Sequence, residues 1–245
     1  MPSKASIYRK RAQELIKKHN WEGAIKEYKQ IAELDQSNPN IYNELGDLYL
    51  KADLKSEAMK SYERAIDAYT RVSLLNNAVA VCKKLLRFQT GNIEIFAKLG
   101  SLRRKQGFLK EATTYYLAYI EKLVLDVSIE PEAMRQKVIA LADEMHDSAE
   151  VLETAVGYLL KWEARESGIQ VLKKLLLMYQ SSGKTERAEE AKQRLLGLGV
   201  SEEAVQSVLA RQQQKNETNG WSEDKLWTKS PMSDGERIEV DRDIS

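Results

Sequence analysis

Apolar residues recur with the spacing of one helix face along most of the chain up to about position 200. Ile41, Leu45, Leu48 and Tyr49, for example, fall at positions i, i+4, i+7 and i+8. This period is typical of an amphipathic helix that buries one side. Comparable segments follow one another with short polar breaks up to Gly197 and Gly199. The pattern predicts a series of short helices, each packed by one face on its neighbours.

Two of these segments are copies of each other. Residues 42–66 align without a gap on residues 96–120, at an offset of 54. Small residues allow two helices to cross closely, and a tyrosine one turn later fills the gap between neighbouring pairs. A weaker third copy begins at Val156-Gly157, at an offset of 57. The matched residues are Leu45, Gly46, Ala58 and Tyr62 in the first copy and Leu99, Gly100, Ala112 and Tyr116 in the second.

A shorter period runs through the same positions. Ala24 and Tyr28 match Ala58 and Tyr62 at an offset of 34. A period of this length that marks Leu-Gly, Ala and Tyr positions resembles the tetratricopeptide repeat (TPR) family. The resemblance implies an all-α fold, a right-handed α-solenoid of TPR-like helix pairs with about 12 helices. The same offset relates further sets: Ala78 and Cys82 to Ala112 and Tyr116. Gly183, Ala188 and Leu195 keep the relative spacing of Gly107, Ala112 and Tyr119.

The two periods together predict the order of the helices. The offset of 54 is the sum of 34 and 20, and a step of 20 covers about one helix and one turn. We therefore expect a flexible N-terminus over 1–4 and a solenoid over 5–200, closed by a capping helix over 201–215 that Ser201 begins. Pro131 suits the first turn of a helix. The solenoid is expected to contain a hairpin, 5–19 and 22–35, and three-helix units near 41–89, 93–145 and 149–197.

The composition changes after Lys215. Residues 216–245 hold eight acids and four bases, a net charge of −4, so the preceding residues carry +5 of the chain's total of +1. Sparse apolar residues and no helical period predict a disordered acidic tail. Its Trp221, Leu226 and Trp227 can bury area only against a surface supplied from elsewhere, either the chain's own groove or a partner. A chance pair of exposed tryptophans is the alternative.

No set of residues predicts catalysis, a cofactor or a metal. The two histidines, His19 and His146, are far apart and have no carboxylate or cysteine at ligand spacing. Cys82 takes the position of a repeat tyrosine, which predicts core packing, and a single cysteine excludes a disulfide framework. No signal peptide is visible, and no apolar run approaches the roughly 20 residues that span a bilayer. We expect a cytoplasmic protein that is not an enzyme.

The TPR resemblance also implies a binding groove lined by the first helix of each pair. Its row of residues is mostly basic with an aromatic end, which favours an acidic or amphipathic peptide, although scattered solvating lysines would give a similar row. Glu44 stands where one TPR subfamily needs an asparagine to bind a carboxylate, which disfavours that clamp. The expected groove residues are Arg9, Gln13, Lys17, Asn43, Asp47, Leu50, Lys51, Ala97, Ser101, Arg104, Lys105, Thr154, Tyr158, Lys161 and Trp162.

The function expected from these features is a non-catalytic protein–protein interaction scaffold or adaptor. It would bind partner peptides or proteins in the groove, and through its tail, and so support assembly of a multiprotein complex. Docking of the tail within the same chain is a further possibility. The alternative is a helical-repeat RNA-binding protein. A body charge of +5 and groove residues that do not repeat disfavour nucleic acid.

Overall fold

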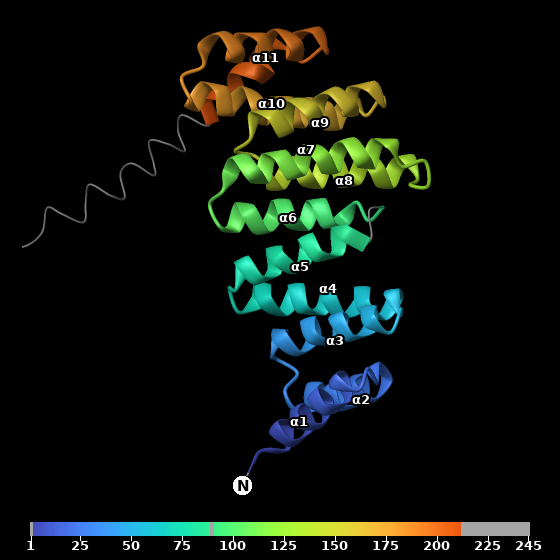
Figure 1. The fold of residues 1–245 in the computed structure, drawn as a ribbon. Coiled ribbons are helices and arrows are strands. Elements are labelled where there is room, and N and C mark those ends of the chain that lie inside the picture. Colours follow the sequence, from blue (N-terminus) through green and yellow to red (C-terminus); the bar gives the residue numbers. More distant parts are fainter. Residues whose placement is uncertain (1, 89–90, 212–245) are drawn as a thin grey trace, which may run out of the picture. The chain divides into compact units, whose positions relative to one another are not determined.

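The computed structural model describes residues 2–88 and 91–211. All regular structure within these ranges is helical, with eleven labelled helices and one more at residues 202–211, which confirms the expected all-α fold (Figure 1). The labelled helices are α1 (Lys4–Lys17), α2 (Trp21–Leu34), α3 (Pro39–Lys51), α4 (Lys55–Arg71), α5 (Leu75–Phe88), α6 (Glu94–Lys105), α7 (Leu109–Leu125), α8 (Pro131–Glu144), α9 (Ala149–Lys161), α10 (Arg165–Ser181) and α11 (Thr185–Gly197).

The chain forms two compact units that divide within α10, after Gly168. In the first unit each helix packs on the next from α1 to α9, and α7 also contacts α9. Successive helices of this unit run antiparallel and stack in chain order, which is the arrangement of an α-solenoid (Figure 1). In the second unit, Ala188, Ala191 and Leu195 of α11 are buried together with Val205 of the last helix. Lys192 and Glu202 form an ion pair of 2.5 Å there.

Left-handed backbone residues mark the turns at the predicted spacing. A residue in this conformation commonly ends a helix, because it lets the next amide satisfy a free carbonyl. His19, Asp53 and Ser73 have φ values of 56°, 57° and 59°, and Gly107 has φ +80°. These residues follow one another at offsets of 34, 20 and 34, so the alternation of long and short steps is confirmed. Gly183, with φ +68°, ends α10 in the same way.

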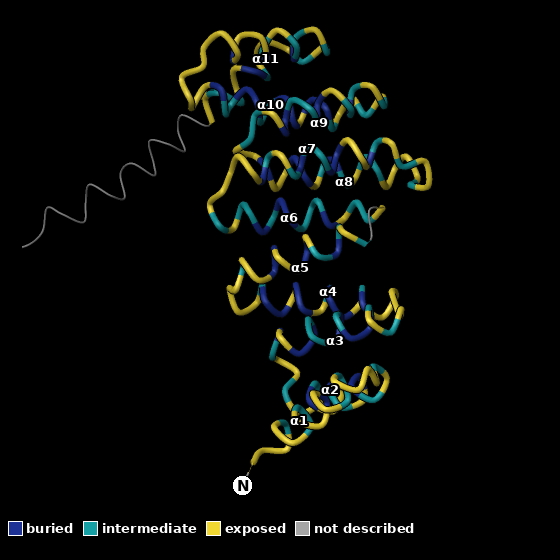
Figure 2. The backbone as a smooth tube through the Cα atoms, viewed as in Figure 1, coloured by how far each residue is buried: buried dark blue, intermediate teal, exposed yellow. Residues whose placement is uncertain are grey.

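The Leu-Gly and Tyr positions of the repeat pack directly on one another. A Cβ added at Gly46 would lie 2.5 Å from Cε1 of Tyr62, and one at Gly100 would lie 2.8 Å from the ring of Tyr116. Both tyrosines are fully buried. The glycine therefore makes room for the tyrosine ring of the partner helix, and such buried positions alternate with exposed ones along each helix (Figure 2).

The third copy of the repeat differs from the prediction. Gly157 is exposed, and no atom lies within 4 Å of where its Cβ would be, so the close crossing predicted there was wrong. The end of α9 and the start of α10 follow those of α6 and α7 at an offset of 56, not 57. At this offset buried Val156 replaces Gly100. The small residue is instead Gly168 on α10, whose Cβ would lie 2.7 Å from Cδ2 of Leu160.

Helix starts agree with the capping residues of the sequence. Pro131 is in the first turn of α8, and the Ser201 hydroxyl accepts a hydrogen bond of 3.2 Å from the amide of Ala204, both as predicted. The Ser3 side chain caps α1 by accepting from the amide of Ser6. No helix in the described part of the chain is long and apolar enough to span a membrane. The predicted tail over 216–245, with Trp221, Leu226 and Trp227, lies outside the described residues.

Candidate protein-binding site

The structure distributes the predicted groove residues over four helices of the first unit. It brings some of them into contact with charged partners and leaves others exposed. Arg9, Gln13 and Lys17 lie on α1; Asn43, Asp47, Leu50 and Lys51 on α3; Ala97, Ser101, Arg104 and Lys105 on α6; and Thr154, Tyr158 and Lys161 on α9, which Trp162 follows.

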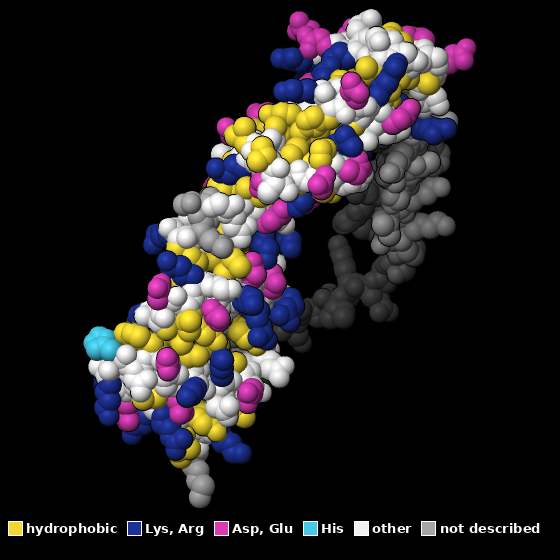
Figure 3. Space-filling model, turned by 90° about the vertical axis from the view of Figure 1, so that its right-hand side faces the viewer, with side chains coloured by type: hydrophobic (Ala, Val, Ile, Leu, Met, Phe, Trp, Pro, Cys, Tyr) yellow, Lys and Arg dark blue, Asp and Glu magenta, His cyan; other side chains and the backbone are white. Residues whose placement is uncertain are grey.

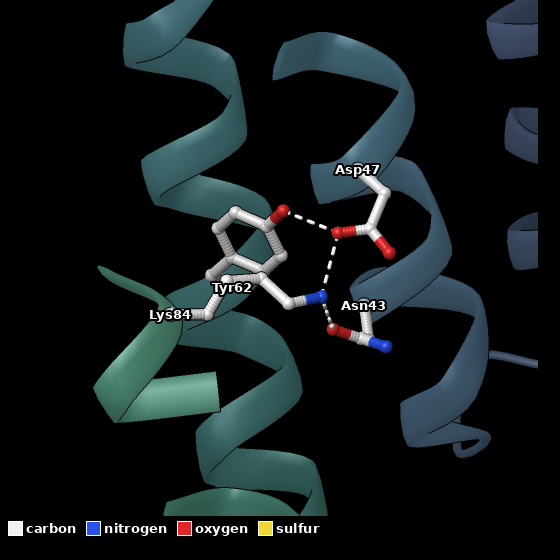
Figure 4. Close-up of polar contacts among 4 residues, drawn as sticks. All are labelled: Asn43, Asp47, Tyr62 and Lys84. Atoms are coloured by element: carbon white, nitrogen blue, oxygen red, sulfur yellow. Dashed lines mark hydrogen bonds and ion pairs between the residues drawn. The ribbon is translucent and has the colours of Figure 1, made fainter. Parts of the chain in front are cut away.

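Asp47 is the centre of a polar network that joins α3, α4 and α5. Its Oδ1 accepts a hydrogen bond from the Tyr62 hydroxyl and forms an ion pair of 2.6 Å with Nζ of Lys84 (Figure 4). The same ammonium donates to Oδ1 of Asn43 at 3.0 Å and lies 5.0 Å from the centroid of the Tyr62 ring. Burial raises the pKa of Tyr62, and the Asp47 carboxylate raises it further. The network holds three successive helices together at the groove positions of α3.

A second cluster joins α1, α2 and α3. The guanidinium of Arg9 lies 3.7 Å from the Glu44 carboxylate. Burial, followed by the charge of Glu44, raises the pKa of Tyr28 to about 12, and Arg9 opposes that rise. A pocket of about 400 Å³ next to Arg9 is also lined by Gln13 and Asn38. The acid at the clamp position is therefore already engaged with a cation from α1.

In the second repeat copy, the tyrosine hydroxyl has a different hydrogen-bond acceptor. The Tyr116 hydroxyl donates to Oε1 of Glu144 on α8 at 2.7 Å, whereas Tyr62 donates to an acid on α3. Ser101 contacts the same Tyr116 hydroxyl. Arg104 forms an ion pair of 3.1 Å with Asp147, in the connection between α8 and α9. The acid that accepts from the repeat tyrosine therefore lies on α3, the first helix of its three-helix set, in the first copy. In the second copy it lies on α8, the third helix of its set.

The aromatic end of the row lies beside an apolar pocket. Tyr158 and Trp162 stack with ring centroids 5.4 Å apart. Trp162 also lines a pocket of about 520 Å³, at the connection between α7 and α8. Its apolar walls include Val127, which is fully exposed, and Met134. This pocket is large enough to take one bulky apolar side chain.

Four lysines of the row occupy equivalent positions at the ends of their helices. Lys17, Lys51, Lys105 and Lys161 are the last residues of α1, α3, α6 and α9, where a cation also complements the helix dipole. Lys51 lies 5.0 Å from the centroid of the Trp21 ring. The other three are exposed, and none of them forms an ion pair within the described residues. These three lysines are available to an acidic ligand.

Sequence reasoning missed the partners of the groove residues. Lys84 and Glu144 were not predicted, and the repeat does not preserve them, because Val138 stands at the position that matches Lys84 at the offset of 54. Glu44 was noted only as an unfavourable acid, although its partner Arg9 was among the predicted residues. Cys82 is fully buried, and burial raises its pKa to about 12, which confirms core packing. No group of His, Cys, Asp or Glu in the described ranges could hold a metal ion.

The comparison with family models identifies one repeat of the chain. Residues 12–53, which cover α2, α3 and part of α1, match the model of the TPR repeat. The chain contains a TPR repeat. No curated protein matches its sequence significantly. The match includes Glu44 and Asp47 on α3, so the acids of both clusters belong to the matched TPR repeat.

Solved structures similar to this chain share little sequence with it. MamA is 19% identical, with 81% of this chain and 93% of that chain covered and a TM-score of 0.35. PilW, a type IV pilus biogenesis factor, is 16% identical, with 85% and 100% covered and a TM-score of 0.31. YrrB, a TPR protein with an unusual peptide-binding site, is 18% identical, with 74% and 88% covered and a TM-score of 0.25.

Proposed function

We propose that this chain is a non-catalytic interaction scaffold that binds acidic, amphipathic segments of partner proteins and holds them in a complex. The observation that carries this proposal is the set of exposed lysines Lys17, Lys105 and Lys161 at the ends of α1, α6 and α9. Each lacks an ion-pair partner in the described part of the chain. An acidic ligand would supply those partners.

The aromatic end of the row gives the ligand its amphipathic character. The pocket at Trp162 is lined by six apolar residues together with Asp126, Ser128, Glu130 and Arg135. Burial of one large apolar side chain there would contribute about 1.5–3 kcal/mol. The ligand proposed is therefore a segment with several acids and one bulky apolar residue.

The remaining groove cations have a structural role in this proposal. Arg9 is engaged with Glu44, and Arg104 with Asp147. Such pairs set the shape of the surface, and reversing either charge would disturb packing as well as binding. The binding test therefore uses the unpaired lysines and leaves these two arginines unchanged.

Selection from a displayed library of random peptides, each long enough to span two helix pairs, on the full chain tests the proposal. The selected peptides should be enriched in Asp and Glu with at least one Trp, Phe or Leu. Their binding should be lost in the variant Lys17→Glu, Lys105→Glu, Lys161→Glu. Selection of basic or charge-neutral peptides, or of none above background, would count against the proposal.

A matched control separates groove binding from total charge. Lys60, Arg71 and Arg87 are also exposed and form no ion pair within the described residues. Arg71 and Arg87 lie in the last turns of α4 and α5. Replacing them with Glu therefore opposes the helix dipole as replacing the three groove lysines does. The variant Lys60→Glu, Arg71→Glu, Arg87→Glu should keep peptide binding.

A further inference from the structure

The net charge of this protein is confined to the two ends of its chain. Residues 1–20 hold six cations and one acid, a net charge of +5. Residues 216–245 hold a net charge of −4. The stretch between them, 21–215, carries equal numbers of positive and negative side chains, because removing +5 and −4 from the total of +1 leaves zero. A charge contrast of this size between two segments favours their association.

The cations at the N-terminus form one exposed surface on α1. Lys4, Arg11 and Lys18 recur at every seventh position, so they lie in one row along the helix, and Lys10 lies beside this row. All four are exposed, and none forms an ion pair in the described part of the chain. Lys and Arg side chains gather at this level of the molecule, the lowest part of Figure 3. We call these four residues the basic row.

Some other cations of the first unit are paired with acids. Lys98 lies 3.5 Å from Asp67, and Lys137 forms an ion pair with Glu94. Glu14 lies one turn from Lys10, Arg11 and Lys18 but forms no ion pair with them within the described residues, so four cations face one acid and repel one another. A bound polyanion relieves that repulsion. An exposed apolar side chain also lies beside the row. Ile7 is one turn from both Lys4 and Arg11, and it is 40% exposed.

We propose that the acidic C-terminal segment of this same chain, residues 216–245, docks on the basic row of α1. The segment carries eight acids for the cations, and it places Trp221 and Trp227 on either side of Glu223 and Asp224. Tryptophan rings pack on exposed Lys and Arg by cation–π contact and can cover Ile7. Tethering raises the effective concentration of the segment, so weaker pairing is enough for docking within one chain than between separate chains.

Docking of this segment regulates the groove. Gln13 and Lys17 belong to the same helix as the basic row. The docked segment covers that end of the proposed groove and competes with acidic partner segments. The docking itself does not rest on the proposed function, because the charge pattern and its test involve no partner; the competition with partner segments does rest on it.

Photocrosslinking of the full chain tests the docking. p-Benzoylphenylalanine is placed at position 227 instead of Trp227, and crosslinks are mapped by mass spectrometry at low protein concentration. The expected result is a monomer-mass product joined to residues 4–18. The yield should fall about tenfold in the variant Lys4→Glu, Arg11→Glu, Lys18→Glu, and comparably in about 0.5 M salt, where the screening length is roughly 4 Å.

The variant Lys60→Glu, Arg71→Glu, Arg87→Glu is the control, since it changes the net charge by the same amount. Reversal of Lys4 favours the helix dipole and reversal of Lys18 opposes it, so α1 should keep its stability, which circular dichroism checks. Crosslinks that avoid residues 4–18, that fall equally in both variants, or that occur only at dimer mass would overturn the proposal.

A nucleic-acid role for the basic row is a separate outcome of the same experiment. A short poly(U) RNA is added to the full chain and to the basic-row variant. RNA binding that is lost in that variant, with no crosslink to α1, would assign the row to RNA and reject tail docking. If crosslinking succeeds while peptide selection on the groove fails, the docking stands and only the proposed function is lost.

Discussion

At Gly46 the absence of one side chain decides how closely α3 and α4 pack. An added Cβ would lie 2.5 Å from the ring of Tyr62, which is fully buried and cannot move aside. We predict that Gly46→Ala destabilises the protein by about 1–3 kcal/mol. This loss outweighs the gain of about 1 kcal/mol that alanine brings to a helix. Urea denaturation followed by circular dichroism measures the change.

Gly157→Ala is the matched control for this prediction. Gly157 is also inside a helix, but it is exposed, and no atom lies within 4 Å of its Cβ position. Alanine there should stabilise the protein by about 0.5–1 kcal/mol. If the two substitutions shift the denaturation midpoint in the same direction, the packing role of Gly46 is wrong.

Cys82 provides a second prediction at the residue scale. Burial raises the pKa of its thiol to about 12, above the value of about 8.5 in an unfolded chain. The thiol should therefore resist Ellman's reagent at pH 8 until urea unfolds the protein. Its contribution to stability is complete below about pH 8.5 and is lost as pH rises toward 12, because only the unfolded thiol releases its proton in that range. Rapid labelling of the folded protein would contradict its burial.

At the scale of the elements, the Asp47 network couples α3 to α5. A double-mutant cycle with Asp47→Ala and Lys84→Ala should give a coupling energy of about 0.5–1 kcal/mol. This value is modest because 44% of the Asp47 side chain and 33% of the Lys84 side chain are exposed. The cycle is measured by urea denaturation. Lys83→Ala replaces Lys84→Ala in the control cycle, and equal coupling in both cycles would exclude a specific contact.

The helix order and the repeat were predictable because they depend on local residues. The crossing of neighbouring helices depends on features that can be read along the chain. These features are the apolar periodicity, the Gly46 and Tyr62 positions, and the alternating long and short offsets. The partners of the groove residues were not predictable. Lys84 and Glu144 reach their partners from helices distant in the sequence, and the repeat copies do not preserve them. The prediction placed the third copy one position out of register, because it aligned the exposed Gly157 with Gly100, whereas the structure aligns Val156 with Gly100.

At the scale of the whole molecule, the proposed docking joins the two oppositely charged ends of the chain. If residues 216–245 compete for the groove, a chain that ends at residue 215 should bind an acidic amphipathic peptide about 3–10-fold more tightly than the full chain. Fluorescence anisotropy of a labelled peptide measures this difference, which should vanish in about 0.5 M salt. Weaker binding after removal of the segment would show that it contacts the peptide instead of competing with it.

The most direct test of the scaffold function is the affinity of the full chain for one peptide selected on it. Anisotropy titrations compare the unaltered chain with the variant Lys17→Glu, Lys105→Glu, Lys161→Glu and with the control Lys60→Glu, Arg71→Glu, Arg87→Glu. The groove variant should raise Kd about tenfold or more, which is at least about 1.4 kcal/mol, and the control less than about twofold. Equal affinities in the two variants would contradict binding at the groove lysines.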